Sequence, residues 1–149
     1  MTPQFAHLLE QSLNHLQNGN FQAAELLLKQ VIEIDPFQVD ANRFLGIIYA
    51  QSGYPEQALT FFGRALNAAP NDGIILSNIG NVLHALKRYS EALSHHEKAI
   101  TLLPTYPEAY NNKGNTLYDL GRYEEALFFY EKAISLAPNY AQAYGNRGN

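Results

Sequence analysis

The side chains best suited to acid–base or metal chemistry are histidines and carboxylates, and their spacing argues against both. His95 and His96 are the one adjacent histidine pair, and neighbours on a helix do not share a face. Glu108 and the pair Glu124 and Glu125 have no positioned partner for general acid–base catalysis. The chain has no cysteine, which excludes thiolate nucleophiles and Cys-based zinc sites. We expect no catalytic residue, no metal site and no cofactor.

A different chemistry is offered by carboxamides that recur at an interval of 34 residues. Two series occur: Asn78, Asn112 and Asn146, and Asn81, Asn115 and Asn149. Asparagine is a mediocre helix former, so its repetition at matching positions needs a reason. Each carboxamide carries both a donor and an acceptor. A row of them can hydrogen-bond the main chain of an extended peptide, whatever its side chains.

The elements that position these groups follow from a repeat of the same length. Four prolines are spaced by 34 residues: Pro36, Pro70, Pro104 and Pro138. A fixed period of this size indicates a repeat array. We divide the chain into units at 5–38, 39–72, 73–106 and 107–140, with a truncated fifth unit at 141–149. Residues 1–149 are interpreted as a single array.

Each unit is predicted to form two helices joined by a tight turn. Two apolar series with the 3–4 spacing of a helix face occur in every unit. Glycines that suit a left-handed helix end lie between them: Gly19, Gly53 and Gly121. Lys87 takes this place in the third unit, where we expect a small strain or a slightly different helix end. The period proline should end the second helix, and Pro55 and Pro107 fit a first helical turn.

Glycine also recurs inside the first helix, at the eighth position of a unit. Gly46, Gly80 and Gly114 occupy it, and each costs about 1 kcal/mol relative to alanine. The positions expected to face them, the twentieth and twenty-seventh, are mostly alanine. We therefore predict a close approach of two helix backbones, with these alanines opposite the glycines.

The column pattern resembles the tetratricopeptide repeat family over almost the whole chain. The residues that carry the resemblance in the second unit are Leu45, Gly46, Tyr49, Ala58, Phe62, Ala65 and Pro70. The resemblance implies an all-α fold, a right-handed superhelical solenoid of antiparallel helix hairpins. It also implies that the first helix of each unit lines a concave inner surface.

The asparagine series is similar to the ladder that lines the repeat superhelix of the O-linked N-acetylglucosamine transferases and their bacterial relatives. That resemblance implies a peptide-binding concave face, for which we name Asn78, Asn81, Asn112, Asn115, Asn146, His84, Tyr118, Phe44 and Arg43. The alternative is that the asparagines satisfy hydrogen bonds within a helix or between repeats and touch no ligand.

We expect a non-catalytic scaffold that binds a peptide or partner protein. The formal net charge of −4 argues against nucleic acid and anionic membrane surfaces as partners. One alternative is the substrate-recruiting arm of a larger glycosyltransferase with a catalytic domain downstream. Another is a self-association module, a homo-oligomer formed through an uncapped C-terminal end. The absence of cysteine fits a reducing compartment, and we expect a cytoplasmic location.

Overall fold

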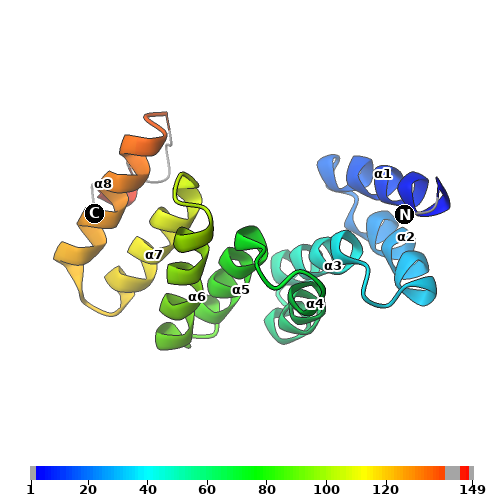
Figure 1. The fold of residues 1–149 in the computed structure, drawn as a ribbon, viewed down its shortest axis with the longest axis horizontal. Helices are drawn as coiled ribbons and strands as arrows, with labels where there is room; N and C mark the ends of the chain where they lie inside the picture. The colour runs from blue at the N-terminus through cyan, green and yellow to red at the C-terminus, as the bar shows by residue number, and fades with distance from the viewer. Residues whose placement is uncertain (1–2, 140–144, 148–149) are drawn as a thin grey trace. The chain divides into compact units, whose positions relative to one another are not determined.

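The computed structural model describes residues 3–139 and 145–147, and Asn149 and most of the truncated unit lie outside them. The helices of the described ranges, shown in Figure 1, are α1 (Pro3–Gln17), α2 (Phe21–Ile34), α3 (Val39–Gln51), α4 (Pro55–Ala68), α5 (Gly73–Ala85), α6 (Tyr89–Leu102), α7 (Pro107–Asp119) and α8 (Tyr123–Leu136). Residues 145–147 form a further helical segment.

The helices fall into two compact units, which we call the N-terminal unit (Met1–Pro70) and the C-terminal unit (Asn71–Asn149). Each unit holds two helical hairpins: α1–α2 and α3–α4 in the first, α5–α6 and α7–α8 in the second (Figure 1). Within a unit the hairpins stack, because α2 packs on α3 and α6 packs on α7. Helices α5 and α7 also contact each other directly. The all-α prediction is confirmed.

The sequence signals for helix ends operate as predicted. Helices α2, α4, α6 and α8 each end two residues before a period proline. Proline lacks an N–H and disfavours helical conformation in the residue before it. Pro55 and Pro107 lie in the first turns of α4 and α7. The side chain of Asp72 caps α5 by accepting from the backbone N–H groups of Ile74 and Ile75.

The hairpin turns share one geometry, in which a left-handed residue follows the first helix. Gly19, Gly53 and Gly121 have φ values of 74°, 85° and 80°. Lys87 adopts φ 62° at the equivalent place, as the sequence predicts. The N–H of Arg88 donates to the carbonyl of Leu83 at 2.9 Å, which closes the turn. The left-handed conformation crowds a Cβ atom against the following carbonyl oxygen, so Lys87 stores local strain.

Lys87→Gly is expected to raise the free energy of unfolding by about 0.5–1 kcal/mol, since relief of the left-handed strain outweighs the entropy that glycine adds to the unfolded chain. Urea denaturation followed by circular dichroism measures the change. Lys87→Ala is the matched control, because it removes the same side chain but keeps the Cβ atom. Equal midpoints for the glycine and alanine variants would show that backbone strain is not the cause.

The helix glycines meet aromatic rings, which corrects the expectation that alanines lie opposite them. A Cβ atom built on Gly46 would lie 2.6 Å from the ring of Phe62, and one on Gly114 would lie 2.6 Å from the ring of Tyr130. Ala126 also contributes a near atom, because its carbonyl oxygen would lie 3.2 Å from a Cβ atom on Gly114. In the second, third and fourth units the ring at position 24 (Phe62, His96 or Tyr130) lies against the partner helix, and the glycine leaves room for it.

No helix in the described part of the chain combines the length and the apolar character needed to cross a bilayer.

Candidate functional site: a carboxamide and tyrosine face

The C-terminal unit carries most of the residues predicted to bind a ligand, on α5, α7 and the segment 145–147. Two of the asparagines make equivalent contacts one repeat apart. The amide nitrogen of Asn112 lies 3.4 Å from the hydroxyl of Ser77, and that of Asn146 lies 3.0 Å from Oδ1 of Asn111. Both acceptors are buried, at 2% and 1% exposure. The resemblance implies that first helices line a concave surface, but Ser77 on α5 and Asn111 on α7 are buried against the next repeat and offer no surface to a ligand.

Asn146 and Asn115 are coupled through their carboxamides. Asn146 also donates to Oδ1 of Asn115 at 2.9 Å, so both of its N–H groups have protein partners. Oδ1 of Asn115 accepts a second bond from the hydroxyl of Tyr130 at 2.8 Å. Within the described residues, the carbonyl of Asn146 and the NH2 group of Asn115 have no hydrogen-bond partner, so both are open to a ligand.

Asn78 and Asn81 differ from the other carboxamides of the series. Neither forms a side-chain hydrogen bond within the described part of the chain. Asn78 is half-buried and Asn81 is exposed. Both functions of each carboxamide are thus left for water or a ligand. The hydrogen bonding between repeats considered as an alternative role is present at Asn112, Asn115 and Asn146, and absent at these two.

His84 links α5 to α7 through both ring nitrogens. Nδ1 lies 2.7 Å from the hydroxyl of Thr116, and Nε2 lies 2.8 Å from Oδ2 of Asp119. A carboxylate only accepts, so Nε2 carries the proton. At Nδ1 the ring of His84 shares a hydrogen bond with the Thr116 hydroxyl. Its ring also meets Tyr89 edge-on, with centroids 5.4 Å apart. His84 is therefore held in one orientation.

Thr116, His84 and Asp119 have the types and order of a nucleophile, base and carboxylate triad. The hydroxyl of Thr116 also lies 3.2 Å from the backbone carbonyl of Asn112, and Thr116 has no exposed surface. An acyl substrate cannot reach that oxygen without unpacking α7 from α5. The arrangement joins two hairpins and offers no reactive nucleophile.

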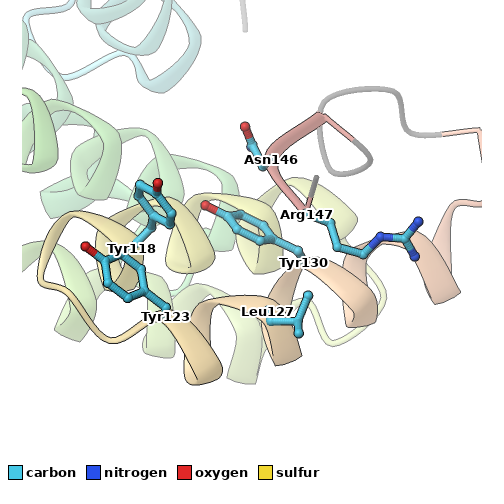
Figure 2. Close-up of a pocket in the computed structure, with 6 residues that line it drawn as sticks. All are labelled: Tyr118, Tyr123, Leu127, Tyr130, Asn146 and Arg147. Carbon is cyan, nitrogen blue, oxygen red and sulfur yellow. The ribbon is translucent and has the colours of Figure 1, made fainter. Parts of the chain in front are cut away.

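Tyrosines from α7 and α8 line two pockets of about 290 and 280 Å³, and Figure 2 shows the first of them. Tyr118, Tyr130 and Asn146 line both of them. Burial, with the negative charge of Asp119 nearby, raises the pKa of Tyr130 to about 12. Its hydroxyl therefore stays protonated and keeps donating to Asn115. Tyr123, Leu127 and Arg147 complete the first pocket, and His84, Asn115 and Asp119 complete the second.

Arg43 and Phe44 belong to the N-terminal unit, on α3. The guanidinium of Arg43 lies 4.6 Å from the ring centroid of Phe44 and 3.4 Å from Oδ1 of Asp40. Both side chains are half-buried. The guanidinium of Arg43 is therefore already stacked on Phe44 and paired with Asp40. Only the N–H groups that do not face Asp40 are left for a ligand.

Sequence reasoning missed four residues that line or support this face, namely Thr116, Tyr123, Tyr130 and Arg147. Tyr130 occupies position 24 of its unit, and its ring lies in the core at 4% exposure. Its hydroxyl was the overlooked signal, because Phe62 and His96 occupy the same column without one. His95 and His96 do not come together: His95 Nδ1 lies 2.8 Å from the carbonyl of Glu91, while His96 is buried. No cluster of three metal-ligating side chains occurs among the described residues.

Family models described as Tetratricopeptide repeat match residues 15–77 and 71–139. Among solved structures, one of pilF from Pseudomonas aeruginosa superposes with a TM-score of 0.88 at 26% identity, covering 97% of this chain and 66% of that one. A crystal structure of MamA superposes with a TM-score of 0.80 at 25% identity, covering 92% of this chain and 80% of that one.

Two curated relatives match parts of the sequence. The type IV pilus assembly protein PilF of Pseudomonas aeruginosa is 32% identical over 84 residues, which is 56% of this chain and 33% of the relative. Anaphase-promoting complex subunit 3 of Schizosaccharomyces pombe is 27% identical over 101 residues, which is 68% of this chain and 15% of the relative. The chain thus spans a third or less of the length of these relatives.

Proposed function

Because the chain belongs to the tetratricopeptide repeat family, we propose that it is a non-catalytic scaffold whose α5–α7 face holds an extended peptide or a segment of a partner protein. One observation carries the proposal. Along α5, α7 and the segment 145–147 stand carboxamide groups whose hydrogen-bonding capacity is only partly used within the protein.

The unused groups match what a peptide backbone offers. Each peptide bond presents one N–H donor and one carbonyl acceptor. Asn78 and Asn81 can satisfy both kinds of group. Asn115 can donate to a ligand carbonyl, and Asn146 can accept from a ligand N–H, because their other functions bind each other. Such contacts do not depend on the ligand's side chains.

The energy of these hydrogen bonds limits the affinity that the carboxamides alone can provide. A neutral hydrogen bond contributes roughly 1 kcal/mol net, so four carboxamides contribute roughly 4 kcal/mol, the free energy of a millimolar complex. A tighter complex needs side-chain anchors as well. The exposed tyrosines beside the carboxamides, Tyr118 and Tyr123, are suited to that role because aromatic rings supply large contact areas.

The names of the relatives support a scaffold. One is an assembly protein and another a subunit of a complex. Three further readings stay predictions: the recruiting arm of a glycosyltransferase, a homo-oligomer through the C-terminal end, and a cytoplasmic location. Self-association gains some support from Phe128, which is 63% exposed on α8.

The double substitution Asn78→Ala and Asn81→Ala is expected to weaken peptide binding by about 2 kcal/mol, roughly twentyfold to thirtyfold. These two side chains make no hydrogen bond to other described residues, and alanine favours a helix, so the fold should be retained. The probe is the strongest ligand selected from an array of random dodecapeptides, titrated by calorimetry. Asn67→Ala, an exposed asparagine on α4, is the matched control. Equal affinity for parent and double variant would refute the carboxamide role.

A further inference from the structure

We propose that the two pockets that share Tyr118, Tyr130 and Asn146 together bind a basic side chain, lysine or arginine, of the peptide held on this face. Tyr123 lines the first of these pockets and Asp119 lines the second. The inference rests on the proposed peptide-binding function and adds a side-chain preference to it. Its elements are an aromatic wall, a carboxylate at one end and a set of unused groups in which acceptors predominate.

The wall is made by Tyr118 and Tyr123. Their ring centroids are 4.9 Å apart with an interplanar angle of 64°, and their exposed fractions are 38% and 60%. Figure 2 shows both rings at the same end of the pocket, with Leu127 farther along α8. Cations are attracted to the faces of tyrosine rings, and the methylene stems of lysine and arginine pack along apolar surfaces. A long basic side chain can satisfy both preferences here.

The carboxylate is Asp119, whose side chain is 43% exposed. One of its oxygens, Oδ2, accepts from Nε2 of His84. Within the described residues it makes no ion pair with a lysine or arginine. A carboxylate has about four lone-pair sites, so most of its accepting capacity is unused. Asn146 donates both of its side-chain N–H groups, to Asn111 and Asn115, and within the described residues its side-chain carbonyl accepts no hydrogen bond. A donor-rich, positively charged group complements these acceptors.

The cations near the pocket do not occupy the carboxylate. Arg122 forms two hydrogen bonds to Glu125, at 2.9 and 2.7 Å, which neutralises it. Arg147 lines the pocket, but its side chain extends away from the Tyr118 and Tyr123 rings (Figure 2). An acidic ligand side chain would meet the like charge of Asp119, and a neutral one would leave the carboxylate without a counterion.

The experiment titrates the 15N-labelled chain with short glycine–serine peptides, blocked at both ends, that differ only in one central residue. The central residue is arginine, lysine, glutamine, norleucine or glutamate, and side-chain amide signals of the asparagines report binding. The arginine and lysine peptides are expected to bind at least fivefold more tightly than the glutamine and norleucine peptides. Asp119→Asn should reduce that preference to less than twofold.

Two further variants keep the result interpretable. Glu124→Gln removes the same charge from an exposed carboxylate in the neighbouring turn, and should leave the preference intact. Tyr123→Leu alters an exposed ring, so it should spare the fold and weaken the basic peptides selectively. Equal binding of all five peptides, or a preference that survives Asp119→Asn, would overturn the basic pocket while the backbone-binding function stands. Absence of any shift with every peptide would instead contradict the proposed function itself.

Discussion

Gly80→Leu is expected to lower the free energy of unfolding by about 3 kcal/mol. A Cβ atom at this position would lie 2.5 Å from Cε1 and 2.7 Å from Nδ1 of the His96 ring. That ring is completely buried, so it cannot swing into solvent to make room. Even alanine forces a shift, and its better helix propensity, about 1 kcal/mol, works against the clash. The ring contact therefore explains why the chain retains a glycine inside a helix.

Gly63→Ala supplies the matched control for this substitution. Gly63 also lies inside a helix, α4, but a Cβ atom there has no neighbour within 4 Å. Alanine should therefore raise stability at this site by about 0.5–1 kcal/mol, whereas Gly80→Ala should lower it. Urea denaturation of the parent and the three variants tests both signs. If Gly80→Leu unfolds at the parent's midpoint, the packing account is wrong.

Acidification from pH 7 to pH 5 is expected to cost the C-terminal unit about 2 kcal/mol through His96 alone. Burial lowers the pKa of His96 from 6.5 to about 3, and the positive charges of His84, His95 and Lys113 act in the same direction. Neither ring nitrogen has a hydrogen-bond partner among the residues that the structure describes. Below pH 6.5 His96 is protonated in the unfolded chain but stays neutral in the folded chain. The contribution of His96 to the free energy of unfolding is therefore fully present above pH 6.5. It falls by about 1.4 kcal/mol per pH unit as the pH drops towards 3.

His96→Phe should remove this acid sensitivity and raise stability at pH 7 by about 1–2 kcal/mol, because no buried nitrogen then lacks a partner. A phenyl ring fits the position, since Phe62 occupies the equivalent place over Gly46 in the N-terminal unit. Urea denaturation at pH 7.5 and pH 5 provides the comparison, with His95→Gln as the neighbouring control that should keep the parent's acid loss. The same acid loss in His96→Phe and the parent would show that another group titrates.

The sequence by itself determined the hairpins. Their signals are local: a period proline that cannot continue a helix, left-handed positions at Gly19, Gly53 and Gly121, and apolar residues at helical spacing. Each acts within a few residues, so the period of 34 was enough to place the ends of α2, α4, α6 and α8. It also placed the asparagine series on first helices, since equal positions in a repeat have equal local environments.

Only the tertiary structure decided what those side chains meet. The partners of Asn112 and Asn146 lie 35 residues back along the chain, and that of His84 lies 32 residues ahead. Spacing predicts the helix that carries a carboxamide, but its hydrogen bonds depend on how closely neighbouring hairpins pack and on rotamers chosen by that packing. Packing between hairpins also explains why Asn78 and Asn146 differ. The carboxamide of Asn78 makes no hydrogen bond to the described chain, whereas both N–H groups of Asn146 are bonded to Asn111 and Asn115.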